Sequence, residues 1–352
     1  MCLSRGVTDS SCSWMALAAS VLLASQIGEV AAQRVSRIGQ SEPARRGEKP
    51  NLDVPDITSP DNEMARGVVR GPAQELKPRF QPGCTYRFVN ELEVKLQFPV
   101  RGPREAKIEQ QSRFDAGIRK DGKPGMSLKG RTERLKVEMI AMGESVSYDS
   151  LDAEDRQTPL GQHLNQSLTQ WVELKLNKED RIVSEEVGGR QATASPLEGF
   201  PQFGTSDLGQ TVAVVLQGMP DEAVRPGESW TVKGVRRLTE TGEVTMDILC
   251  RFRGEVTHEH NRFMQIDLTG EASGDVALPT RGPEGGKPVL MAFEVPTLIG
   301  KILYDPLEQM VRLSEQTVNM TVEIPGGPGV APLVVPMQQK SKIQLLHVVP
   351  TP

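Results

Sequence analysis

Hydrophobic and polar residues alternate with a period of two along most of the chain from residue 85 onward. In residues 85–98 the even positions are apolar except for Asn90, and the odd positions are polar or charged except for Val89. Because successive side chains of a strand point to opposite faces, this alternation predicts one long strand with a buried face and a solvated face. A helix would distribute the same charges all around its surface.

The same alternation recurs in both halves of the chain. It is found in residues 107–119, 135–141, 146–148, 246–253 and 264–269, and residues 301–324 are interpreted as a strand, a turn and a long strand. Short polar stretches separate these segments, such as the glycine- and proline-containing residues 120–125 and the predicted hairpin tip at residues 258–261. Strands with one solvent-exposed face are typical of antiparallel sheets. We therefore expect a mainly β protein built of antiparallel sheets of long amphipathic strands.

Two segments show helical spacing instead. Leu160, Leu164, Leu168 and Trp171 recur every three or four residues, which predicts one amphipathic helix between residues 159 and 171. A second short helix is expected near residues 208–216. The predicted fold therefore contains one or two short helices beside its strands.

Two turn motifs suggest that the body consists of two related halves, residues 81–195 and 205–350. Pro82-Gly83 precedes Tyr86, and Pro226-Gly227 precedes Trp230, 144 residues later. A second pair of matching turns follows, "NKEDRIV" from Asn177 and "DPLEQMV" from Asp305. Matching features in the same order indicate an internal duplication, although common turn chemistry alone could also produce them.

The first 32 residues have the pattern of a signal peptide. Trp14–Ala24 is an apolar run of suitable length, and the small residues Val30 and Ala32 predict cleavage after Ala32. The run is too short to span a bilayer as a helix, and no other stretch of the chain is long enough to do so. We therefore expect an exported protein, periplasmic or secreted, with a buried N-terminal helix as the alternative interpretation.

Residues 33–80 resemble a disordered tether. They contain six prolines and a single aromatic residue, Phe80, and show no sustained apolar period. A segment of this composition buries too little apolar surface to offset the entropy lost on ordering.

The balance of charge excludes some partners. The formal net charge is −5, and removal of residues 1–32, which carry one cation and two anions, changes it to −4. Without a basic patch the chain has no footprint for nucleic acid or for an anionic membrane surface.

Few residues suggest site chemistry. Cys84 and Cys250 remain after signal cleavage and could form a disulfide in an oxidising compartment, or they could be two buried thiols. His258 and His260 are weak metal candidates, because no third ligand is close in sequence. The sequence thus assigns no metal and no cofactor.

No catalytic residue is assigned either. The chain lacks a nucleophile elbow, a histidine beside either remaining cysteine, and a phosphate-binding loop. Methionines fall on the expected inner faces of several strands, namely Met139, Met246, Met264 and either Met310 or Met320. Such methionines usually form plain core, but a curved sheet lined by them could also enclose an apolar ligand.

Three short motifs resemble those of a family of exported bacterial proteins, the domain of unknown function 6263. They are "VRPGESW" at residues 224–230, "YDS" at residues 148–150, and "YDPLEQMV" at residues 304–311. The resemblance covers roughly residues 80–350, and it implies secretion and a duplicated β-rich body. It supplies no catalytic residues.

Two functions are compatible with these features. The favoured one is a non-enzymatic exported protein that binds an envelope partner or an apolar, lipid-like small molecule. The alternative is a secreted hydrolase whose carboxylates converge from distant strands.

Overall fold

The structure, a computed structural model, describes residues 71–98, 102–141, 144–188, 205–216, 218–239, 242–278, 289–324 and 331–351. The predicted signal peptide and the predicted tether up to residue 70 lie outside the described residues.

In the described part of the chain, twelve strands form one antiparallel sheet, which confirms the predicted mainly β fold. Their alternating sequences place one face of each strand in the core and leave the other in solvent. The strands are β1 (Cys84–Phe98), β2 (Gly102–Ile118), β3 (Met126–Ala141), β4 (Glu144–Asp149), β5 (Trp171–Leu176), β6 (Ile182–Gly188), β7 (Ser229–Thr239), β8 (Gly242–His258), β9 (Asn261–Leu278), β10 (Val289–Asp305), β11 (Met310–Ile324) and β12 (Leu333–Pro350).

Two short helices and one 3-10 turn accompany the sheet in the described part of the chain. They are η2 (Asp155–Gln157), α2 (Pro159–Leu168) and α3 (Thr205–Leu216). At the start of α2 the Gly161 amide donates to Thr158 Oγ1 at 3.0 Å, and Pro159 occupies the first helical position, where no amide is needed. The helix ends at Leu168, before the predicted limit, because Trp171 begins β5 and pairs with Gly188.

The two halves of the chain share one continuous sheet. The strand order is β6-β5-β3-β2-β1-β12-β11-β10-β9-β8-β7, with β4 paired to β3 outside this path. The first strand of the body therefore pairs with the last, from Cys84 opposite Pro350 to Leu96 opposite Met337. This pairing joins the halves edge to edge, and β6 and β7 remain as the two free edges of the path.

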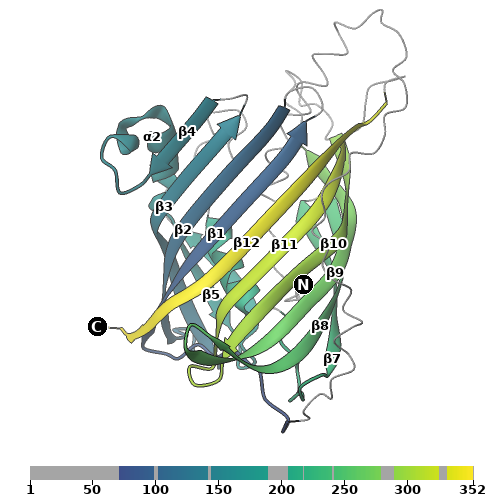
Figure 1. Cartoon of the computed structure of the whole chain (residues 1–352). Coiled ribbons are helices and arrows are strands. Elements are labelled where there is room, and N and C mark those ends of the chain that lie inside the picture. Colours follow the sequence, from purple (N-terminus) through teal and green to yellow (C-terminus); the bar gives the residue numbers. More distant parts are fainter. Residues whose placement is uncertain are drawn as a thin grey trace, which may run out of the picture.

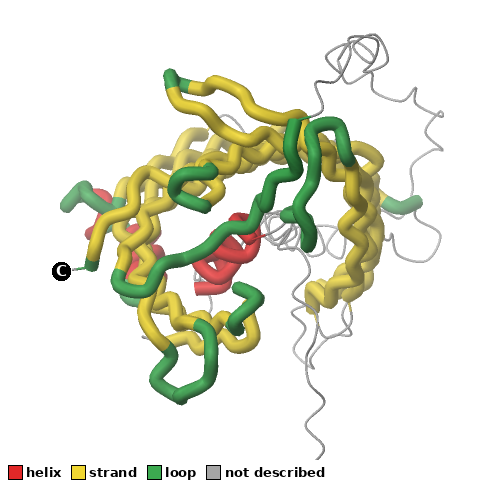
Figure 2. Tube along the Cα trace, turned by 90° about the horizontal axis from the view of Figure 1, so that it is seen from below, coloured by secondary structure: helices red, strands yellow, loops and turns green. Residues whose placement is uncertain are grey.

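The sheet is strongly curved, and its core lies on the concave face (Figures 1 and 2). Seen from below, strands surround a central helix (Figure 2). This helix is α3, which contacts strands of both halves, β5 and β11. Helix α2 packs on the same face, because its core partner Ile108 and the main-core residue Phe114 are both inward residues of β2.

The folded body begins before the predicted boundary at residue 81. Leu76 and Phe80 are buried in the main core, and Gln74 forms an isolated bridge with Val224 ahead of β7. The Arg79 amide donates to the Gln309 carbonyl at 2.8 Å, at the turn between β10 and β11. The assignment of residues 71–80 to a tether was therefore wrong, because Leu76 and Phe80 find apolar partners that are remote in sequence.

The two Pro-Gly motifs adopt the same local structure. Gly83 and Gly227 have φ values of 82° and 92°, in the left-handed region that glycine tolerates best. The Gly83 amide donates to Ala116 of β2, and the Gly227 amide donates to Phe252 of β8. This shared geometry agrees with the predicted duplication, which remains a prediction.

The hairpin of β8 and β9 ends at residues 258–261, as the sequence predicted. Glu259 and His260 both have positive φ, 48° and 69°, as in the tight turns that suit twisted hairpins. Near this tip Phe263 packs with Leu303 and Leu313 in a small separate cluster.

Candidate functional site

The concave face carries a continuous apolar surface that crosses the sheet. The main core includes buried residues from β1, β2, β3, β5, β8, β9, β10, β11 and β12. Its methionines confirm the predicted inner positions: Met246, Met310 and Met320 are buried, and Met139 and Met264 are partly buried against the core.

Described residues fill the lower part of this face, toward the ends of β1 and β12 at Cys84 and Pro350. Val212 and Val215 of α3 belong to the main core, and Gly218 after the helix lies against Ile302 and Leu268. The indole of Trp230 donates to the Gly218 carbonyl at 3.1 Å. Leu76 and Phe80 join the same core.

The upper part of the concave face extends beyond the reach of α3, and its inward side chains are buried in the main core. A helix of 12 residues extends about 18 Å, whereas a strand of 15 residues such as β1 or β11 extends about 50 Å. The principal contacts of α3 are with β3, β5, β6 and β11. Above it, buried apolar side chains are in register across three strands: Leu96 opposite Met337, Met337 opposite Met320, and Val335 opposite Val322. We take this upper concave surface, defined by these five residues and Phe293, as the candidate ligand site.

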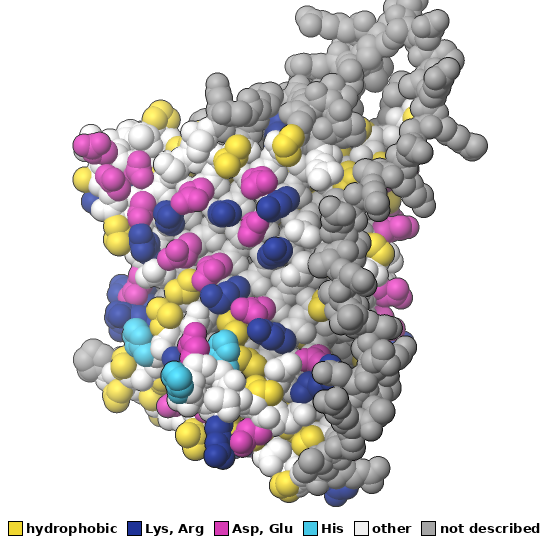
Figure 3. All heavy atoms as spheres, viewed as in Figure 1, with side chains coloured by type: hydrophobic (Ala, Val, Ile, Leu, Met, Phe, Trp, Pro, Cys, Tyr) yellow, Lys and Arg dark blue, Asp and Glu magenta, His cyan; other side chains and the backbone are white. Residues whose placement is uncertain are grey.

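The convex face, in contrast, is charged and balanced (Figure 3). One row of outward residues crosses five strands as Lys136, Glu109, Glu91, Lys342 and Glu315. A shallow groove of about 560 Å³ lies along this row and its neighbour.

Each carboxylate in that groove lies beside a cation. The nitrogen–oxygen distances are 3.1 Å for Lys342–Glu91, 3.3 Å for Lys95–Glu93, 3.9 Å for Arg134–Glu109, 2.7 Å for Lys136–Glu138 and 2.9 Å for Lys301–Glu315. Lys136 also holds the pKa of Glu138 below its ordinary value, mainly through a hydrogen bond. A general acid for hydrolysis needs a raised carboxyl pKa, so this arrangement fits a solvated face better than a hydrolase cleft.

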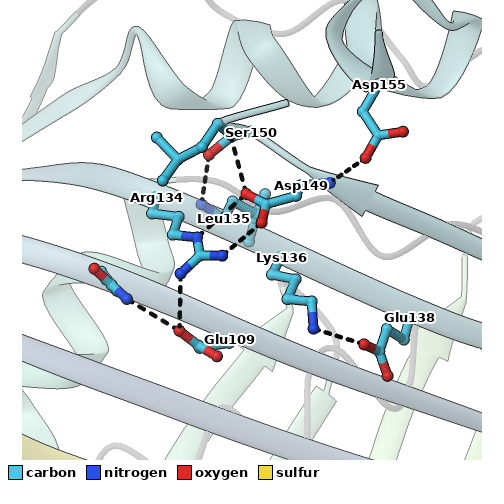
Figure 4. A network of polar contacts seen from close by, with 10 residues as sticks. Glu109, Arg134, Leu135, Lys136, Glu138, Asp149, Ser150 and Asp155 are labelled. Atoms are coloured by element: carbon cyan, nitrogen blue, oxygen red, sulfur yellow. Dashed lines mark hydrogen bonds and ion pairs between the residues drawn. The ribbon is translucent and has the colours of Figure 1, made fainter. Parts of the chain in front are cut away.

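A polar network fixes β4 and the α2 region to the sheet (Figure 4). Arg134 of β3 donates to both oxygens of Asp149, with Nη2 2.5 Å from Oδ2 and Nε 3.2 Å from Oδ1. These bonds lower the pKa of Asp149. The Asp149 amide donates to Asp155 of η2 at 2.7 Å, and Ser150 Oγ accepts the Leu135 amide at 2.9 Å. The network is structural, since it links β3, β4 and η2.

Burial affects other titratable groups inside the body. It raises the pKa of Tyr86, Tyr148 and Tyr304 to about 12 in each case. Near the lower end Arg119 lowers the pKa of Asp121 to about 2, chiefly through hydrogen bonding. These tyrosines anchor packed segments: the Tyr304 hydroxyl donates to the Lys77 carbonyl at 3.0 Å, and the Tyr148 hydroxyl donates to Asn165 Oδ1 at 3.0 Å.

The two cysteines do not pair. The structure contains no disulfide between Cys84 and Cys250, which the sequence left as one of two alternatives. Both lie on the apolar side as expected, but Cys84 begins β1 and Cys250 lies in β8, with β12, β11, β10 and β9 between them in the sheet. The alternation of apolar and polar residues indicated the face of the sheet on which each cysteine lies, but not how many strands separate the two cysteines.

The histidines form no metal site with their neighbours. His258 and His260 lie at the hairpin tip, and His258 packs edge-on against Phe263 with ring centroids 6.3 Å apart. No group of three or more histidine, cysteine, aspartate or glutamate side chains suited to a metal is found among the described residues.

The sequence did not predict where the candidate ligand site lies. It predicted inward methionines strand by strand, but Leu96, Met337 and Met320 become neighbours only through the pairing of β1 with β12. No local signal encodes that pairing. In the described part of the chain, no helix has the length and apolar character needed to cross a membrane.

The fold defines this chain only as a protein with one large antiparallel β-sheet. No family model and no curated protein matches it, so the resemblance to the exported family stays a prediction. Among solved structures, a lipovitellin structure described by its lipid–protein interactions is similar with a TM-score of 0.43 and 12% identity, over 78% of this chain and 26% of that one. DynF from the dynemicin biosynthesis pathway of Micromonospora chersina gives a TM-score of 0.22 and 8% identity, over 86% of this chain and 92% of that one. This chain thus spans about a quarter of the lipovitellin chain, and neither likeness carries a functional argument.

Proposed function

We propose that this protein is a non-enzymatic, exported binding protein that holds an apolar, lipid-like molecule against the upper concave surface of its sheet. The observation that carries the proposal is the set of inward apolar side chains, buried in the main core, that extends along the strands beyond the length of the short helix α3. Export is supported by the signal-peptide pattern of residues 1–32.

The chemistry of the surface suits such a ligand. Methionine and branched aliphatic side chains adapt to apolar molecules of varied shape, and Met320 and Met337 lie side by side at this site. Ligand sites in curved sheets commonly combine a predominantly apolar lining with few polar groups. The charged convex face lacks such a lining and would stay in water.

The proposal can be tested with a substitution that fills the site. Val335 points inward and is buried, whereas its neighbour Val334 points outward and is 46% exposed. We expect Val335→Trp to fold and to reduce the binding of the apolar fluorescent probe diphenylhexatriene at least tenfold, because the indole occupies the ligand volume. Val334→Trp serves as the matched control and should bind the probe as the unaltered chain does.

Two results would contradict the proposal. If the unaltered chain does not bind the probe, the concave surface is not a ligand site. If Val335→Trp unfolds the protein while Val334→Trp does not, the upper concave surface is a close-packed core with no room for a ligand.

A further inference from the structure

A band of uncharged polar residues crosses the concave face midway along the strands. It lies below the candidate ligand site and extends over five neighbouring strands, β3, β2, β1, β12 and β11. The pairing places Thr132 opposite Ser112 and Gln110 opposite Asn90. The band consists of Thr132, Gln110, Ser112, Asn90, Ser341 and Ser314.

These residues point to the concave face, because they alternate along their strands in step with the buried core residues. Ser112 lies between Gln110 and Phe114 among the buried positions of β2, and Ser314 has Ile343 and Ile302 as its paired neighbours. Only 1% of Ser112 and 2% of Ser314 is exposed. Within the band the Gln110 side chain donates to Thr132 Oγ1 at 2.9 Å.

The hydroxyls of Ser112 and Ser314 have no hydrogen-bond partner in the described structure. A buried hydroxyl without a partner is unfavourable, and such groups in native proteins usually bond to a water or a ligand. Two of them in one band leave two hydroxyls on this face that a water or a polar group of a bound molecule would satisfy. Three strand spacings separate the two serines, about 14 Å along the sheet, so one small group cannot reach both.

The band also has the wrong chemistry for an ionised ligand. Along β2 the inward residues from Ala106 to Ala116 include no charged side chain, and the first cation in line, Arg104, lies near the start of that strand. The described inward residues of β1, β12 and β11 at the level of the band are likewise uncharged. A carboxylate or phosphate there would lose its hydration without gaining a counter-ion.

We infer that the ligand is an uncharged acyl lipid with several hydroxyl or ester oxygens, the chemical class of monoacylglycerols and diacylglycerols. Its chains lie on the upper concave surface, and its polar group bonds to the band, with Ser112 and Ser314 as binding residues. This inference rests on the proposed function and adds the class of ligand to it.

The test compares the full-length chain with the double variant Ser112→Ala/Ser314→Ala. Ser147→Ala, at an exposed position of β4, is the matched control. Diphenylhexatriene, which has no hydrogen-bonding group, should bind all three proteins equally. Monooleoylglycerol should displace the probe about tenfold less effectively from the double variant than from the other two, since each lost hydrogen bond weakens binding a few-fold. Oleate, which is anionic, should displace it less effectively than monooleoylglycerol from the unaltered chain.

Each result has a distinct meaning. Absence of probe binding to every protein would remove the proposed function itself. Equal displacement by monooleoylglycerol from the double variant and the control, or preference for oleate, would overturn only the assignment of ligand class. The thermal midpoint of the ligand-free double variant should equal or exceed that of the unaltered chain. A lower midpoint, or failure to fold, would show that the hydroxyls bond within the protein and would also overturn the assignment.

Discussion

Ion pairs at the single-residue scale divide into exposed pairs of the convex face and the better-held pair Arg134–Asp149. The convex pairs join long side chains in water, where each contributes little. Arg134 makes two hydrogen bonds to Asp149, and both side chains are less than one third exposed, at 29% and 25%. The second arrangement stabilises the fold more, because it is bidentate and partly shielded from water.

Substitution of Arg134 by alanine should therefore lower the free energy of unfolding by about 2 kcal/mol. The loss follows from removing both bonds and leaving the carboxylate of Asp149 without its cation. Chemical denaturation at neutral pH measures it. Lys233→Ala, which breaks the exposed pair with Asp247, is the control and should leave the free energy of unfolding almost unchanged. Equal effects of the two substitutions would refute the distinction.

The Arg134–Asp149 pair also predicts how the stability of the fold changes as the pH falls. Because Arg134 lowers the pKa of Asp149 in the folded state below its ordinary value of 3.8, the unfolded chain takes up the proton first as the pH falls. This contribution is complete above the unfolded pKa and is lost as the pH falls toward the folded value. Asp149→Asn should therefore flatten the decline of the thermal midpoint between about pH 5 and pH 2. An unchanged slope would contradict the assignment.

The buried tyrosines predict that the fold loses stability as the pH rises into the alkaline range. Their pKa values rise to about 12 on folding, so the stability that they contribute is complete below the ordinary value of 10.0 and is lost as the pH rises from 10.0 to 12. Absorbance at the phenolate band and the far-ultraviolet circular dichroism should change together in this range. Ionisation of all tyrosines near pH 10 in a folded chain would contradict their burial.

At the scale of single elements, the amino-acid pattern was a good guide to the strands and a poor guide to their ends. Parity alone located β1, β2, β8 and β9, because each residue's face is a local property. Parity could not show that α2 stops at Leu168, since the pairing of Trp171 with Gly188 is a contact between separate strands. The burial of Leu76 and Phe80 was missed for the same reason, because their partners lie far along the chain.

The Pro-Gly turn before β1 is an element whose geometry requires glycine. Gly83 has a φ of 82°, and a Cβ there would meet nothing within 4 Å, so the backbone conformation is the only obstacle to a side chain. Gly83→Ala should lower the free energy of unfolding by about 1 kcal/mol. Gly117→Ala, in a regular position of β2 where the nearest atom is 3.7 Å from the added Cβ, should not have this cost. Denaturant midpoints of the two variants measure the difference, and equal values would exclude strain at the turn.

At the scale of the whole molecule, the two halves form one continuous sheet only through the pairing of β1 with β12. Read from β7 to β12 and then from β1 to β6, the sheet is an uninterrupted series of neighbouring strands, with β4 added beside β3. The sequence predicted two related halves, but it could not show whether they form separate sheets. That outcome depends on a register between strands more than 200 residues apart, for which no local pattern exists.

The same sheet order predicts the chemistry of the cysteines. Cys84 is partly exposed, and Cys250 of β8 is buried in the main core. Peptide mapping after alkylation should therefore modify Cys84 in the folded protein and Cys250 only after unfolding, and it should find no peptide that links the two. A linked peptide under non-reducing conditions would contradict the strand separation.

The central claim, that the concave face holds a lipid-like molecule, is tested most directly by native mass spectrometry of the full-length chain incubated with monooleoylglycerol. We predict a one-to-one complex that releases the lipid on collisional activation, and that is lost in Val335→Trp but retained in Val334→Trp. A spectrum of the ligand-free mass alone, or a complex that persists equally in both variants, would contradict the account.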